Sequence, residues 1–199
     1  MEGEKGMKKF LFNLERKDWT LEKDYGEEGI IATLDFECDW VQRDLRDHTF
    51  EATAKWYPEV KEFTIVKRLT DACWVVYIVT KPKLGGLVAS RDMVNLYYTR
   101  EMGNAYYVSS MSTTWPGLEP RKEMVRAEMQ EGGGISFSPD PKRNGRTLVR
   151  WVRSQDFKVP LVPSALLQRL YVEACRRYIA GMRKYLSARH RLRLEIVQE

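Results

Sequence analysis

The side chains that most often carry out catalysis or bind metals are few in this chain and lie far apart. The two histidines, His48 and His190, form no HExxH-type pair. The three cysteines are Cys38, Cys73 and Cys175, and no CxxC spacing joins any two of them. No paired carboxylates accompany them at a spacing that indicates general acid–base work. We therefore predict no catalytic residue, no metal site, no cofactor and no enzymatic activity.

The composition indicates a globular domain in a reducing compartment. Of the 199 residues, 43% are hydrophobic and 31% are charged, a balance that excludes general disorder. An odd number of widely spaced cysteines predicts buried thiols instead of disulfides. Acidic residues in the first five positions argue against a signal or transit peptide, and no uninterrupted apolar stretch has the length of a membrane span. We expect one domain over residues 1–199, monomeric, cytoplasmic and in transient peripheral contact with membranes.

The net charge of +5 is concentrated at one end of the chain. Residues 165–199 hold eight Lys or Arg against three Asp or Glu, which accounts for the whole excess. Apolar residues recur at helical spacing from Ala165 to about Ser187, so we predict a long helix followed by a basic tail at 188–199. A basic helix favours anionic membrane headgroups. No motif of interleaved aromatic and basic residues accompanies it, so we expect no nucleic-acid partner.

The region between the two ends is rich in predicted strands. Alternating or β-branched runs bounded by turn residues predict strands at 29–35, 62–69, 72–80, 92–100, 105–113, 124–131, 135–138 and 146–155. Helical spacing predicts a further helix at 5–17, while residues 41–57 are ambiguous and fit a helix that ends before Tyr57-Pro58. This order of elements predicts an α+β fold, in which a curved antiparallel sheet wraps around the C-terminal helix and encloses a packed core or a cavity.

Short motifs over residues 56 to about 186 resemble the START (StAR-related lipid transfer) domain family, in the family's order. Trp56-Tyr57-Pro58-Glu59-Val60-Lys61 resembles W-N-P-x-V-K, and Gly85 to Val94 resembles G-x-x-V-x-x-R-D-F-V. Pro120 to Glu128 resembles P-x-x-x-x-V-R-A/G-E, and Met111-Ser112-Thr113 matches a central strand. Asp156-Phe157-Lys158 with Leu161 to Leu166 resembles the D-L-K-G-x-L-P-x-S segment that opens the final helix. The sequence is most similar to the steroidogenic, sterol-carrying subgroup.

The resemblance implies a helix-grip fold with a hydrophobic tunnel for one lipid, which the protein binds and transfers between membranes without catalysis. A sterol-like ligand is the first expectation. The implied ligand-binding residues are Val76, Ile78, Arg91, Asn95, Tyr97, Met111, Leu166, Leu170, Ala174 and Tyr178. The implied gate and membrane-contact residues are Leu84, Leu87 and Val88 in the loop 81–90, and Arg176, Arg177, Arg183 and Lys184 on the helix.

Two departures from the sterol-carrying subgroup leave alternatives open. The buried acid and arginine of that subgroup fall here on Ile78 and Tyr97, which favours a less polar or differently oriented ligand. The segment between Leu34 and Trp56 is shorter than in the family, which leaves the completeness of the cavity open. A phospholipid or carotenoid-like ligand, and a role as lipid sensor or protein-interaction module, are the alternatives. We expect Arg91 and Asp92 to form a structural salt bridge at the base of the loop.

Overall fold

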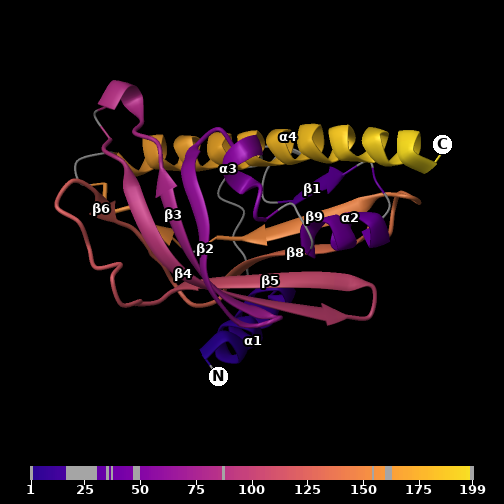
Figure 1. Cartoon of the computed structure of the whole chain (residues 1–199), viewed down its shortest axis with the longest axis horizontal. Helices are drawn as coiled ribbons and strands as arrows, with labels where there is room; N and C mark the ends of the chain where they lie inside the picture. Colours follow the sequence, from indigo (N-terminus) through magenta and orange to yellow (C-terminus); the bar gives the residue numbers. More distant parts are fainter. Residues whose placement is uncertain are drawn as a thin grey trace.

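The chain forms one curved sheet with helices on both of its faces (Figure 1). The computed structural model describes residues 2–16, 31–34, 36, 38–46, 50–86, 88–153, 155–159 and 163–197. The helices are α1 (Glu2–Glu15), α2 (Cys38–Asp44), α3 (Thr53–Trp56), the 3-10 turn η3 (Leu84–Gly86) and α4 (Ser164–Val197). The strands are β1 (Ile31–Leu34), β2 (Val60–Thr70), β3 (Cys73–Thr80), β4 (Arg91–Met102), β5 (Ala105–Ser112), β6 (Val125–Arg126), β7 (Glu128–Met129), β8 (Gly133–Pro139), β9 (Thr147–Val152) and β10 (Gln155–Asp156).

The main sheet has the strand order β1-β9-β8-β5-β4-β3-β2, and all neighbours on this path are antiparallel. Strand β6 pairs parallel with β4, while β7 and β10 form a separate two-stranded ladder. The register between β2 and β3 shifts at three places. Irregularities of this kind increase the bend and twist of a strand, so they curve this edge of the sheet.

Both faces of the sheet are covered, which explains why β3 is buried along almost its whole length. Its side chains alternate between an inner core that includes Trp74, Val76 and Ile78 and an outer core that includes Val75 and Tyr77. Helix α4 lies along the inner side, and α1 lies on the opposite side of the sheet (Figure 1). The predicted arrangement of a curved antiparallel sheet around a long C-terminal helix is confirmed.

Helix α4 is longer than predicted, because it continues from Ser164 to Val197 instead of ending near Ser187. The separate basic tail at 188–199 is therefore wrong for the residues up to Val197. No Gly or Pro follows Gly181, so nothing in this stretch interrupts the helix. The added turns also have partners: the Arg189 guanidinium pairs with the buried carboxylate of Asp44, and the His190 ring packs on that of Trp40 at 5.1 Å between centroids.

The ambiguous region at 41–57 is not one helix: it holds the end of α2 (Cys38–Asp44) and the short helix α3 (Thr53–Trp56). Phe50 and Trp56 are both buried in the inner core. In one helix, six residues rotate the side chain by about 240° from its starting direction, so the two rings would point to different sides. A turn at Phe50, whose carbonyl accepts hydrogen bonds from the backbone and hydroxyl of Thr53, allows both rings to reach the core.

The predicted strands at 124–131 and 146–155 are each interrupted as well. In the first, Ala127 is completely buried between β6 and β7, and its N–H donates to the carbonyl of Asp92 at 2.9 Å. The two short strands on either side then pair with different partners, β4 and β10. The strand predicted at 146–155 is divided into β9, which pairs with β8 as far as Val152, and β10, which pairs with β7.

Candidate functional site

A cavity of about 180 Å³ lies between the inner face of the sheet and the first half of α4. Its roof on α4 is made by Leu170, Tyr171, Ala174 and Tyr178. The sheet and the segment before α4 contribute Phe63, Ile78, Met93, Tyr97, Val108, Ile135, Trp151, Phe157 and Val159 to a mostly apolar wall. Phe50, Thr53 and Tyr57 close the end formed by α3 and its flanking residues. The shortened segment before Trp56 thus still provides an end wall.

Six of the ten predicted ligand-binding residues line this cavity: Ile78, Arg91, Tyr97, Leu170, Ala174 and Tyr178. Val88 of the predicted gate lines it too. Leu87 and the side chain of Leu84 lie outside the described residues. The two positions where the sterol-carrying subgroup has its acid and arginine therefore face the cavity here, with an aliphatic side chain and a phenol in their place.

Four predicted lining residues do not reach the cavity. Met111 does not line the cavity, because Ser110 takes the inward position on β5. The Met111 side chain therefore points to the outer face, under Gly6 of α1. Leu166 does not line the cavity either, and it is 40% exposed. Residues 166 and 178 are three i,i+4 steps apart, which rotates the helix face by about 120°.

Val76 and Asn95 are the other two, and both are completely buried. They pair with each other on β3 and β4, between the residue pairs that contain Ile78 and Tyr97. The Asn95 amide donates to the Met129 sulfur at 3.1 Å. They therefore support the cavity floor without being part of its surface.

Arg91 and Asp92 do not pair with each other, so the expected salt bridge between them is wrong. They are consecutive on β4 and thus point to opposite faces of the sheet. The Arg91 guanidinium donates to the carbonyls of Ala89, Phe157 and Lys158. It therefore ties the loop 81–90 to the segment that leads into α4.

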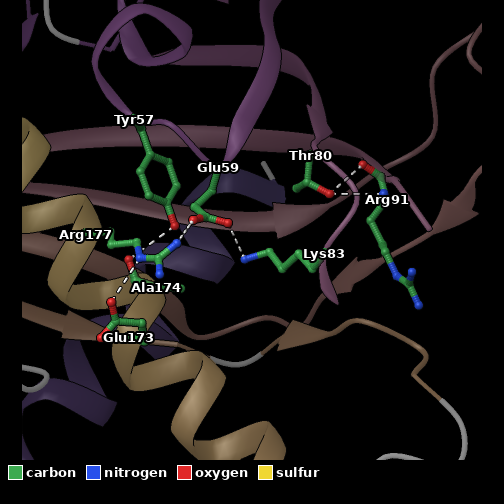
Figure 2. A network of polar contacts seen from close by, with 8 residues as sticks. All are labelled: Tyr57, Glu59, Thr80, Lys83, Arg91, Glu173, Ala174 and Arg177. Carbon is green, nitrogen blue, oxygen red and sulfur yellow. Dashed lines mark hydrogen bonds and ion pairs between the residues drawn. The ribbon is translucent and has the colours of Figure 1, made fainter. Parts of the chain in front are cut away.

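Glu59 joins that loop to helix α4 through an ion-pair network (Figure 2). One carboxylate oxygen lies 2.6 Å from the Lys83 ammonium, and the other lies 2.7 Å from the Arg177 guanidinium. Arg177 also pairs with Glu173, one turn earlier on α4, at 2.9 Å. The Glu59 side chain is only 14% exposed. We call Lys83, Glu59 and Arg177 the latch, because these three side chains connect the loop to the roof helix.

The latch predicts a specific pH dependence of stability. Burial raises the pKa of Glu59, but hydrogen bonds from Lys83 and Arg177 outweigh it and hold the pKa below its ordinary value. A lowered folded-state pKa means that the stabilisation is present above the unfolded value of about 4.3 and is lost as pH falls through the lower folded value. We expect Glu59→Gln to destabilise the protein by about 1–2 kcal/mol at pH 7. In urea titrations, the stabilities of the two proteins should converge as the pH falls through the lowered folded-state pKa of Glu59.

Glu173→Gln is the matched control, because its carboxylate is 48% exposed and contacts only the Arg177 side of the latch. Its cost should stay near the ~0.5 kcal/mol of an exposed i,i+4 pair. Equal losses for the two variants would show that Glu59 does not connect loop and helix.

Sequence reasoning missed Arg153, which also lines the cavity. Its guanidinium lies 4.7 Å from the Trp151 ring centroid and donates to the Gln155 side-chain oxygen at 2.7 Å. The signal was present in the sequence, because the alternation of the strand predicted at 146–155 places Trp151 and Arg153 on the same face. An arginine that continues an apolar strand face is an unusual core residue.

The predicted membrane-contact residues of α4 differ in exposure. Lys184 is exposed, and Arg177 keeps 54% of its side chain exposed despite its ion pairs. Arg176 and Arg183 are half-buried, so they fit the prediction less well. Arg191 of the predicted basic tail is exposed on the same helix, and so is Arg169, which was not predicted. No helix within the described ranges is long and apolar enough to cross a membrane.

A curved antiparallel sheet that grips a long C-terminal helix over an internal cavity defines the α+β helix-grip fold. Human StAR-related lipid transfer protein 5 has this fold, with a TM-score of 0.80 over 95% of this chain and 96% of that chain at 16% identity. Human STARD10 matches with a TM-score of 0.65 over 91% of this chain and 82% of that chain at 20% identity. These likenesses establish the fold.

The START domain matches residues 20–193, and the chain therefore belongs to the START domain family. This is a family of lipid-binding and lipid-transfer domains that are generally non-catalytic. The mitochondrial steroidogenic acute regulatory protein of Danio rerio is 25% identical over 145 residues, which are 71% of this chain and 50% of that protein. The chain spans about half the length of the curated relatives it matches. These relatives are named as mitochondrial proteins, so the cytoplasmic location of this chain stays a prediction.

Proposed function

We propose that this protein binds one lipid in the cavity under α4 and transfers it between membranes. The expected lipid resembles a sterol in size and shape. The observation that carries the proposal is the mostly apolar cavity that lies between the sheet and helix α4. Buried apolar area stabilises such a complex by about 25 cal/mol per Å². The Ile78 and Tyr97 positions offer the ligand no ion pair, so apolar contact supplies most of the binding free energy.

Exchange of the ligand requires the roof to move. The cavity of about 180 Å³ is smaller than the roughly 300–1,000 Å³ of typical small-molecule pockets. A sterol-sized body therefore enters only when α4 and the loop 81–90 separate, and the latch holds these two elements together. Lipid phosphates at an anionic surface compete with Glu59 for Lys83 and Arg177, and exposed Lys184 adds attraction. Membrane contact and opening are thereby coupled.

The decisive experiment measures transfer of the fluorescent sterol dehydroergosterol between vesicles. We expect the rate to rise with protein concentration, to increase when phosphatidylserine is added to the vesicles, and to fall with salt because the attraction is screened. Glu59→Gln should transfer several-fold faster than the unmodified protein, because loop and helix separate more easily. Glu173→Gln should leave the rate unchanged.

Two results would contradict the proposal in different ways. Binding of the sterol without faster transfer would identify a lipid sensor. Absence of binding to the sterol and to a panel of phospholipids, fatty acids and carotenoids would exclude the cavity as a lipid site.

A further inference from the structure

Arg153 places a positive charge in the cavity wall that no carboxylate within the described ranges neutralises. Its polar contacts are the Gln155 side-chain oxygen at 2.7 Å and the Cys175 sulfur at 3.5 Å. The Trp151 and Tyr171 rings cover it at 4.7 and 5.6 Å from their centroids. Its Nε atom is buried and has no hydrogen-bond partner. A guanidinium carries five N–H donors, so most of this group's donor capacity is unused.

The other charged residues of the wall differ from Arg153 in this respect. Glu59 and Lys83 form an ion pair, and Arg91 donates to three backbone carbonyls. Their charges therefore serve the structure of the loop and the roof. Arg153 is half-buried, and a charge partly removed from water without such partners costs free energy, which a bound counter-charge would offset.

Two phenols near Arg153 add donors to the same part of the cavity. Tyr97 and Tyr178 both line it, and among the described residues their hydroxyls make no hydrogen bond. Burial raises the pKa of Tyr97 to about 12, partly opposed by the charge of Arg153, and burial likewise raises the pKa of Tyr178. Both phenols are therefore protonated at neutral pH and able to donate.

We propose that Arg153, Tyr97 and Tyr178 form a subsite for the carboxylate of an amphiphilic ligand whose apolar body fills the rest of the cavity. This inference rests on the proposed function, because it assumes that a lipid occupies the cavity. A planar carboxylate accepts two hydrogen bonds from a guanidinium and more from phenols. It is also compact enough for a small cavity, unlike a substituted phosphate headgroup. Fatty acids and acidic sterols share this chemistry.

The test compares two ligands that differ only in the head group, a carboxylate in one and its methyl ester in the other. We expect the fluorescent fatty acid cis-parinaric acid to bind the unmodified protein at least about tenfold more tightly than its methyl ester, the difference of one hydrogen bond to a charged group. Displacement of the probe by palmitic acid or by 5β-cholanic acid distinguishes a fatty-acid from a sterol body. This comparison needs no variant and so is independent of any folding defect.

Variants then assign the effect to Arg153. Arg153→Met should weaken binding of the acid by about tenfold to a hundredfold and leave that of the ester nearly unchanged, and Arg153→Lys should be intermediate. Arg100→Met, which removes an exposed arginine from the end of β4, is the matched control and should change neither.

The outcomes separate this inference from the proposed function. Equal affinity for acid and ester, or an acid preference that survives in Arg153→Met, would overturn the carboxylate subsite while the cavity remains a lipid site. Failure of every acid and ester to bind would overturn this inference, and the proposed function would be overturned with it only if dehydroergosterol also failed to bind.

Discussion

Replacing Ala174 by tryptophan is expected to abolish lipid binding while the protein stays folded. Ala174 lies in the cavity roof, one turn from both Leu170 and Tyr178. An indole at this position occupies the space that the ligand needs, so affinity for any lipid should fall by at least about a hundredfold. The unliganded variant should gain about 0.5–2 kcal/mol of stability, because filling a cavity is favourable. Lipid titration and thermal unfolding measure the two effects.

Ala180→Trp is the control for this variant, because Ala180 is exposed on the same helix. It should bind lipid with unchanged affinity. If Ala174→Trp also kept its affinity, the ligand would have to bind outside the cavity, and the proposed function would lose its main observation.

Replacing Asp92 by asparagine is expected to destabilise the fold by about 3–5 kcal/mol, the cost of breaking a buried ion pair. Asp92 is completely buried, and its two carboxylate oxygens accept from the Arg126 guanidinium at 3.0 and 2.8 Å. The Tyr77 hydroxyl donates to the same carboxylate at 3.3 Å. Removal of the charge leaves Arg126, whose side chain is 16% exposed, without its counter-charge. Urea unfolding monitored by tryptophan fluorescence measures the loss.

The chain offers an exposed ion pair as the matched control for Asp92. Arg46 and Glu101 pair at 2.7 Å with side chains 48% and 54% exposed. Glu101→Gln should cost less than ~1 kcal/mol, because water and salt screen an exposed pair. Similar losses in the two variants would mean that burial does not set the strength of the Asp92 pair.

The predicted ligand-binding residues that line the cavity are placed there by local rules. Ile78 and Tyr97 lie on strands whose side chains alternate, and Leu170, Ala174 and Tyr178 follow the i,i+4 spacing of a helix. The family motifs supplied the order of these elements. The same rules failed where a longer range was needed: Leu166 lies at the end of an i,i+4 series that rotates away, and Met111 lies one residue from the inward position on β5.

Local rules could not predict ion pairs between residues that are distant in the sequence. Glu59 and Arg177 are separated by 118 residues, and Arg126 reaches Asp92 across 34 residues in place of the adjacent Arg91. Such pairs depend on which strands and helices become neighbours. Local spacing does not contain that information, because it is decided only when the sheet closes around α4.

The helix with which the chain ends shows the same division. The sequence alone predicts a long basic helix with one apolar face. The absence of Gly and Pro after Gly181 allows that helix to continue. Only the tertiary structure decides what the apolar face covers: a cavity under the first half and packed rings under the second. Periodicity specifies which side chains share a face. The space left beneath them depends on how side chains from separate strands and helices fill the interior.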